Sequence, residues 1–312
     1  MAKYRTALGW PVKLFPLLAA LAACGAAPCT GSSIAAPVPA VVMLLAGCAA
    51  ASPGGESAYD SMVLASRPVL YLTMSGALSG SETDRSGHGH DGGYHPSGDL
   101  PAVVAMPNSD LAADFNGNGQ YLQVSDAAAL SIPTTGVLTL EAWIRPDTLQ
   151  FTHQEGSGYV YWMGKGRAHA QEYALRMYSR DNTETPPRPN RISGYAFNSD
   201  GGLGSGAYFQ DEPATGQWIM VDLIIDTVST SAAYPTGYVA IYKDGALRQT
   251  QALNQFNVRP ERGEAPFDVA TRNGASFLSG AIGKVAVYDV ASTPDQIQQR
   301  YEAMIRKAPP TP

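Results

Sequence analysis

The sequence predicts an all-β protein, built as a two-sheet antiparallel jelly-roll sandwich with one short helix at the C-terminal end. Short runs of alternating apolar and polar residues fill the chain after Tyr59, and a period of two is typical of strands in a sheet. Turn residues separate these runs, since the 312 residues include 32 glycines and 23 prolines. Only the last such segment has the periodicity of a helix. These observations favour about ten strands or more in a single sandwich.

Three segments give the clearest strand signals. Residues 137–145 (VLTLEAWIR) place apolar side chains on one face and a second set, including Trp143, on the other. Residues 218–226 (WIMVDLIID) are nearly all apolar, as expected for a strand that is covered on both faces. Asp244 and Gly245 separate two more strand-like runs, and Asp-Gly is a strong hairpin signal because both residues tolerate positive φ. The remaining runs are PVLYL, LAADF, YLQVS, YVYWMG, YALRMYS, RISGYAF and GKVAVYD.

The predicted helix lies in residues 292–307 (STPDQIQQRYEAMIRK). Thr293 is placed to cap it, Pro294 suits the first helical position, and Gln296 completes a capping box. One face of the helix is apolar and should pack on the sandwich, through Ile297, Tyr301 and Met304.

The first fifty residues have the pattern of an export signal. No charged residue occurs between Leu14 and Gly55, and basic residues stand in front of this stretch at Lys3, Arg5 and Lys13. All three cysteines of the chain lie here, so the region that follows folds without a disulfide or a thiolate ligand.

Two of these cysteines end a motif like that at which bacterial lipoprotein precursors are lipidated and cut: LAAC at Cys24 and LAGC at Cys48. We favour Cys48, because cleavage at Cys24 would leave the apolar run VPAVVMLLAG exposed in the mature tether. The alternative of a membrane-spanning helix is disfavoured by prolines, which divide the stretch into pieces shorter than the roughly 20 residues needed. We therefore predict export and a lipid anchor in the bacterial cell envelope. The predicted boundaries are a signal and lipobox region (1–47), a linker (48–58), the jelly roll (59–306) and a tail (307–312).

The charge of the chain limits its partners. The formal net charge is −6, and only 15% of the residues are charged. The sequence thus lacks the basic field that attracts nucleic acid, and we predict no nucleic-acid partner.

The order of several segments resembles the laminin-G-like jelly rolls of the concanavalin A-like lectin and glucanase superfamily. The resemblance covers nearly everything after the linker and supports the predicted sandwich. It is carried by PVLYLTMSG, DRSGHGHDG, ADFNGNGQYLQV, LTLEAWIRP, TGQWIMVDLIID, GYVAIYKDGAL and FLSGAIGKVAVYDVASTPDQIQQRY.

The histidine-rich segment at residues 83–95 (TDRSGHGHDGGYH) raises the question of a metal site, because imidazole is the commonest transition-metal ligand. Its glycines provide no rigid scaffold, so ordering the ligands would cost entropy. The resemblance implies instead a loop in which Asp84 and Asp91 bond to nearby backbone amides and the glycines adopt left-handed conformations. We predict a surface turn, with no metal on His88, His90 or His95.

Calcium is a separate question, because members of the superfamily often hold this ion. Where the family usually reads Gly-x-Ile-Asp-Glu-Val, this chain has GAIGKV, with Gly283 and Lys284 at the two acidic positions. The positive charge of Lys284, in place of a carboxylate ligand, argues against a bound calcium ion at this position. A structural calcium site elsewhere is left open and unassigned, and no other cofactor is predicted.

The resemblance to glucanases makes an enzyme the next alternative. Retaining hydrolysis needs two carboxyl groups about 5 Å apart, which the related glucanases supply from a Glu-x-Asp-x-x-Glu stretch that this chain lacks. The nearest acidic clusters, at residues 211–212 and 261–264, do not have this spacing. A Gly-x-Ser-x-Gly nucleophile elbow is also missing. We predict no catalytic residues and disfavour a glycoside hydrolase.

A non-catalytic binding module requires only aromatic rings and polar groups on a rim or concave face. Trp143 and Trp218 match core positions of the family, so we expect them to pack inside. The aromatic residues without such an explanation lie near long polar loops, where recognition is common. We therefore predict that the ligand is bound by Trp162, Tyr178, Tyr195 and Tyr208.

Glycan recognition is the favoured function of this rim. The alternative is an adhesive or structural envelope protein that binds another surface protein. Nothing in the sequence separates a sugar from a protein as the ligand.

Overall fold

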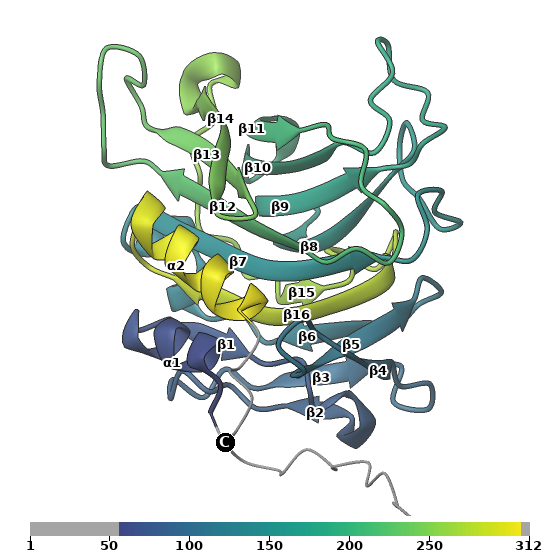
Figure 1. Ribbon diagram of the computed structural model, residues 1–312. Coiled ribbons are helices and arrows are strands. Elements are labelled where there is room, and N and C mark those ends of the chain that lie inside the picture. The colour runs from purple at the N-terminus through teal and green to yellow at the C-terminus, as the bar shows by residue number, and fades with distance from the viewer. Residues whose placement is uncertain (1–55, 307–312) are drawn as a thin grey trace, which may run out of the picture. The chain divides into compact units, whose positions relative to one another are not determined.

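The structure, a computed structural model, describes residues 56–306, which form two antiparallel sheets of eight strands each (Figure 1). Sheet A has the order β14 (Ala246–Ala252), β13 (Tyr238–Lys243), β12 (Ile219–Asp226), β7 (Val137–Pro146), β16 (Ser279–Tyr288), β5 (Leu111–Asn116), β4 (Ala102–Ala105), and β1 (Leu70–Leu72) also pairs with β16. Sheet B has the order β11 (Gly201–Phe209), β10 (Ile192–Asn198), β9 (Ala170–Tyr178), β8 (Tyr159–Arg167), β15 (Phe267–Val269), β6 (Tyr121–Val124), β3 (Gly92–His95), β2 (Ser81–Glu82). The predicted all-β sandwich is confirmed.

The main apolar core lies between the two sheets. Strand β7 shows why: Leu138 and Leu140 face the core, whereas Trp143 belongs to a second apolar cluster on the opposite face of sheet A. Strand β12 is buried along its whole length, because the core covers one face and helical residues cover the other. Both predicted patterns are therefore confirmed.

Two helices, α1 (Ala58–Ala65) and α2 (Pro294–Ile305), lie against the outer face of sheet A and next to each other (Figure 1). They bury the second apolar cluster, which includes Tyr59, Tyr71, Trp143, Met220, Ile297 and Met304. Four short 3₁₀ turns complete the described elements: η1 (Ala77–Ser79), η2 (Ala128–Leu130), η3 (Ile132–Thr134) and η4 (Leu253–Phe256). None of the helices in the described range is both long and apolar enough to span a membrane.

Helix α2 forms as the sequence predicts. The Thr293 hydroxyl accepts a hydrogen bond from the backbone of Gln296, whose side chain bonds back to the Thr293 amide. Ile297 and Met304 are fully buried on sheet A. Tyr301 is half-buried and stacks on Trp143, with 5.8 Å between the ring centroids.

Helix α1 is not predicted by the sequence patterns, which indicate a linker up to residue 58 and then strands. Its N-terminus carries a capping box, in which the Ser57 side chain accepts from the Asp60 amide and the Asp60 carboxylate accepts from Ser57. The helix has only eight residues, and a helix this short is marginal by itself in water. Burial of Tyr59 and Val63 against sheet A stabilises it, and this contact is visible only in the tertiary structure.

The Asp-Gly hairpin between β13 and β14 is confirmed. Asp244 has a φ of 52° and Gly245 a φ of 83°, as a turn with two left-handed residues requires. The Asp244 side chain also accepts a hydrogen bond from the Met220 amide at 2.9 Å, which ties the turn to β12.

Candidate functional site

The candidate site lies on the outer face of sheet B, which neither α1 nor α2 covers. Alternation along the strands directs one set of side chains into the core and the other set away from it. Tyr173, Leu175 and Met177 of β9 belong to the core, whereas Arg176 lines an open cleft. The cleft has a volume of about 560 Å³. Its side chains come from β8 to β11, from the two loops at Gly156–Ser157 and Glu184–Arg191, and from residues 251–256.

Aromatic rings form the floor of this cleft. Tyr161 and Phe197 pack with Ala174 into a small apolar cluster separate from the main core. Tyr159 meets Tyr161 edge to face at 5.3 Å, and Tyr195 stacks on Phe197 at 5.8 Å between ring centroids. The rings are thus held in fixed positions by one another before any ligand arrives.

Glycines in β11 make room for two of these rings. A methyl group on Gly204 would lie 2.6 Å from the Phe197 ring, and one on Gly206 would overlap the ring of Tyr195. Because Gly206 pairs with Tyr195 across the two strands, the ring lies over the neighbouring strand where a larger residue would block it. The glycine-rich sequence of β11 therefore leaves space for the Tyr195 and Phe197 rings in the floor of the cleft.

Arg176 occupies the centre of the aromatic set. Its guanidinium carbon lies 4.2 Å from the ring centroid of Tyr195, 4.6 Å from that of Tyr159 and 4.8 Å from that of Tyr178. It donates one hydrogen bond to the Tyr195 hydroxyl at 2.7 Å. Within the described residues, its buried Nε atom has no hydrogen-bond partner and its side chain forms no ion pair. The guanidinium is therefore fixed by stacking, and most of its donors stay unused.

The loop between β9 and β10 forms one wall of the cleft. The buried Asn182 side chain organises this loop, because its carbonyl oxygen accepts from the amides of Glu184 at 3.3 Å and Arg188 at 3.0 Å. Arg188 donates to the Tyr178 hydroxyl at 3.0 Å and lies 3.5 Å from the Glu184 carboxylate. A hydrogen bond from Ser157 and the charge of Arg188 lower the pKa of Glu184, against the effect of burial.

Tyr208, Gln251 and Gln255 also line the cleft. Tyr208 is 37% exposed and supports the guanidinium of Arg191, whose carbon lies 3.8 Å from the ring centroid. The two glutamine amides add planar hydrogen-bonding groups to the lining. The cleft therefore combines aromatic faces with amide and guanidinium groups, as ligand sites commonly do.

The four predicted binding residues lie in different places in the structure. Tyr195 and Tyr208 line the cleft. Tyr178 is buried directly behind the lining, where it contacts Arg176 and Arg188. The prediction that Trp162 lies on the rim is wrong: its side chain is completely buried in the main core. Its neighbour Tyr161 faces the cleft instead.

The structure also corrects one predicted core position. Trp143 is buried under the helices as expected, with 1% of its surface exposed. Trp218 is only partly buried, at the edge of the second cluster, where its indole nitrogen donates to the Ala105 carbonyl at 3.3 Å. Trp218 immediately precedes β12, which begins at Ile219, so the sheet does not enclose it.

The cleft residues that the sequence did not reveal include Tyr159, Tyr161, Arg176, Arg188, Arg191 and Phe197. A signal for them is present in the strands, because Tyr159 and Tyr161 alternate in β8 as Tyr195 and Phe197 alternate in β10. Which of the two faces of each strand lies in the core is decided by the packing of the two sheets.

Residues 83–91 of the histidine-rich segment form a surface turn, as predicted, whereas Gly92–His95 form strand β3 of sheet B. The Asp84 carboxylate accepts hydrogen bonds from three backbone amides, those of Tyr71, Ser86 and His90. Asp91 accepts from the Asp84 amide at 2.8 Å. The turn contains two left-handed glycines, Gly87 at φ 88° and Gly89 at φ 76°. Among residues 56–306 no group of three or more histidine, cysteine, aspartate or glutamate side chains is arranged to hold a metal.

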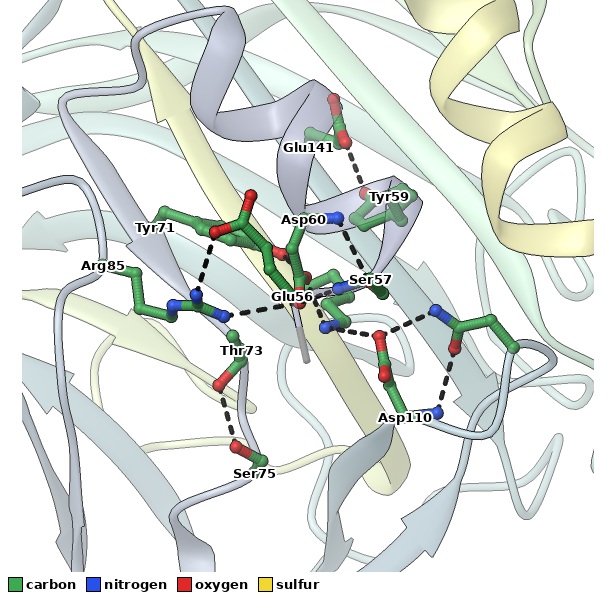
Figure 2. Close-up of polar contacts among 12 residues, drawn as sticks. Glu56, Ser57, Tyr59, Asp60, Tyr71, Thr73, Ser75, Arg85, Asp110 and Glu141 are labelled. Carbon is green, nitrogen blue, oxygen red and sulfur yellow. Dashed lines mark hydrogen bonds and ion pairs between the residues drawn. The ribbon is translucent and has the colours of Figure 1, made fainter. Parts of the chain in front are cut away.

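Lys284 lies in a polar cluster beneath α1. Figure 2 shows Asp60, Arg85 and Asp110 of this cluster. Its ammonium is 2.5 Å from the Asp60 carboxylate and 2.8 Å from that of Asp110. Arg85 approaches Asp60 from the other side at 3.4 Å, and Tyr71 donates a hydrogen bond to the same carboxylate. The protein thus places its own cation between two carboxylates at the position where the family motif is altered.

The fold and the cleft together define a lectin-like β-sandwich with an open, non-helical face. Residues 116–298 match the sequence model of the concanavalin A-like lectin/glucanases superfamily, of the laminin G type. The chain belongs to this superfamily, and the predicted resemblance is confirmed. No curated protein matches the chain in sequence.

Solved structures of neurotoxin domains share the fold. The ligand-binding domain of botulinum neurotoxin serotype D, solved with N-acetylneuraminic acid, has a TM-score of 0.55 and 12% identity and covers 77% of this chain and 52% of its own. The receptor-binding domain of the mosaic serotype C/D has a TM-score of 0.54 and 11% identity and covers 77% of this chain and 51% of its own. The present chain therefore spans about half the length of these domains, and the likeness is one of fold.

Proposed function

We propose that the protein is a non-catalytic binding module that recognises a glycan in the cleft on sheet B. The observation that carries this proposal is the floor of preformed tyrosine rings around Arg176, open to solvent and walled by amide and guanidinium groups. Flat rings suit the C–H faces of sugars, and the polar groups suit their hydroxyls.

Binding without hydrolysis is supported by the acidic groups of the cleft. Glu184 is the only carboxylate among its lining residues, whereas retaining and inverting hydrolysis both need a pair. That carboxylate is occupied by hydrogen bonds from Ser157 and Tyr178. One of the acidic clusters in the sequence is also engaged elsewhere, because Asp211 is paired with Lys243 and Arg248.

The test is a panel of soluble polysaccharides, offered to the full-length chain in an uncharged detergent that contains no sugar. Tyr208→Ala should weaken binding of the retained polysaccharide by about 1 to 2 kcal/mol, as single interface residues that matter do, and should leave folding intact because the side chain is exposed. No reducing ends should appear during incubation.

Tyr234→Ala is the matched control. Tyr234 lines a second hollow, of about 320 Å³ on the outer face of sheet A, together with Tyr238 and Tyr242. Its removal should leave binding unchanged. Loss of binding in Tyr234→Ala but not in Tyr208→Ala would move the site to sheet A, and retention of proteins but of no polysaccharide would favour an adhesive function.

The location proposed for this module is the bacterial cell envelope, with Cys48 as the lipid attachment site. The support is the sequence alone, because Cys24 and Cys48 lie outside the described residues. Two or three acyl chains anchor a protein stably, whereas one gives marginal binding. Cys48→Ser should therefore release the protein from membranes or block its processing, and the same result from Cys24→Ser alone would assign the other motif.

A further inference from the structure

The cleft is cationic although the protein as a whole is acidic. The chain carries a formal net charge of −6. Among the cleft residues, in contrast, three guanidinium groups face a single carboxylate: Arg176, Arg188 and Arg191 against Glu184. The excess of two positive charges is concentrated on the outer face of sheet B, beside the tyrosine rings of the cleft.

Two of the three arginines have no counter-ion within residues 56–306. Arg188 lies near Glu184, but Arg176 donates only to the hydroxyl of Tyr195. Arg191 donates to the neutral side-chain carbonyl of Gln210, through Nε at 3.0 Å and Nη2 at 2.8 Å. A half-buried guanidinium without an anion is costly, because burial removes part of its hydration. An anionic ligand group would offset that cost.

The positions of two arginines beside tyrosine rings also suit a ligand with sugar rings and charges. Arg176 lies at the centre of the tyrosine set, and Arg191 lies over the ring of Tyr208. Both guanidinium groups are thus next to a ring on which a sugar can stack. A planar guanidinium can donate two parallel hydrogen bonds to one carboxylate or sulfate group.

The geometry points to an acidic glycan as the ligand, with its sugar rings on the tyrosines and its carboxylate or sulfate groups on Arg176 and Arg191. This inference rests on the proposed function and specifies the ligand's charge. The competing explanation is that the arginines only pack against the tyrosines by cation–π stacking. In that case their removal would lower stability and would not change which ligands are selected.

The experiment uses acidic polysaccharides in matched pairs, titrated against the full-length chain in the same uncharged detergent. Polygalacturonate, alginate and hyaluronan are each paired with their carboxyl-reduced products, and a sulfated galactan is paired with its desulfated product. We expect an acidic polymer to bind at least about tenfold more tightly than its neutral partner, because hydrogen bonds to charged groups contribute more binding free energy than those between neutral groups. The carboxylate and sulfate pairs show which anion is preferred. Binding should weaken as salt is added, because part of the attraction is exposed to solvent.

Arg191→Gln is the principal variant, because this side chain is partly exposed and its loss should not unfold the protein. It should lower the affinity for the acidic polymer by about tenfold and that for the neutral partner by much less, because a hydrogen bond to a charged group contributes more than one to a neutral hydroxyl. Arg176→Gln should act in the same way if it folds. Arg180→Gln is the matched control, since Arg180 is exposed, has the same charge and does not line this cleft.

The outcomes separate the two proposals. Equal affinity for the acidic and neutral members of each pair would overturn the inference and leave glycan binding in place. An Arg191→Gln variant that binds the acidic polymer as tightly as the wild type would also overturn it. Failure of every polymer to bind would overturn the proposed function and the inference with it.

Discussion

The ammonium of Lys284 in β16 lies 2.5 Å from the carboxylate of Asp60 in α1, although the two residues are 224 positions apart. Lys284 has a φ of 56°, in the left-handed region, and stands at an irregularity in the pairing of β16 with β7. Its side chain is 2% exposed, so the ion pair is almost completely removed from solvent. The contact joins the first helix to the last strand of the sandwich.

We expect Lys284→Met to lower the free energy of unfolding by about 3 kcal/mol, because it leaves two carboxylates without their common cation. Asp60→Asn should cost less, since Lys284 keeps its contact with Asp110. Urea denaturation measures both. Lys243→Met is the control, because the Asp211 partner of Lys243 is more exposed and is also held by Arg248. Equal losses from Lys284→Met and Lys243→Met would contradict the buried ion pair.

The pH dependence of stability should depend on Asp222, which is fully buried between β7 and β13. Burial raises the pKa of Asp222 well above its ordinary value, and the neighbouring carboxylate of Glu141 adds to this rise, whereas Arg300 opposes it. The folded protein therefore holds the proton more tightly than the unfolded chain does. Stability should fall as the pH increases above the unfolded pKa of about 4.

Asp222→Asn removes this titration. Between pH 5 and pH 7, the free energy of unfolding of the wild type should therefore fall by about 1 kcal/mol or more relative to that of the variant. Urea denaturation at the two pH values measures the difference, and Asp200→Asn, at an exposed aspartate, serves as the control. Parallel pH profiles for the wild type and Asp222→Asn would show that the carboxyl group does not stay protonated in the fold.

Trp162→Ala should destabilise the fold by about 3 to 5 kcal/mol, because it leaves a cavity in the core between the sheets. The melting temperature should fall by about 2 to 4 °C for each kcal/mol. Ligand affinity, measured below the transition, should stay unchanged because Trp162 does not line the cleft. Tyr208→Ala should show the reverse pattern. Loss of affinity with an unchanged melting temperature in Trp162→Ala would return this residue to the binding site.

Gly206→Ala should destabilise the protein by about 1 to 3 kcal/mol, as overpacking does, because the added methyl group overlaps the Tyr195 ring and the Gly194 carbonyl. The displaced ring should also weaken ligand binding. Gly98→Ala is the control, since a methyl group there meets no atom within 4 Å. Thermal unfolding and polysaccharide titration measure the two effects, and a Gly206→Ala variant that behaves like Gly98→Ala would show that the ring does not need this space.

Local patterns in the sequence determined the all-β character of the chain, the Asp-Gly hairpin and the cap of α2. Each of these depends on residues close together in the chain, where spacing decides which side chains share a face and which amides can be capped. The family resemblance added the two-sheet sandwich and the turn around Asp84 and Asp91.

Only the tertiary structure decided that Trp162 faces the core while Tyr161 faces the cleft, and that Arg176 lies among three tyrosines from β8, β9 and β10. The side chains of adjacent residues in a strand point to opposite faces of the sheet, and the pairing of distant strands determines which face is buried. For the same reason, the sequence patterns did not predict helix α1 or the Lys284–Asp60 contact. Lys284 and Asp60 are 224 positions apart, and Tyr59 of α1 packs against Trp143 of β7; no local pattern in the sequence records such contacts.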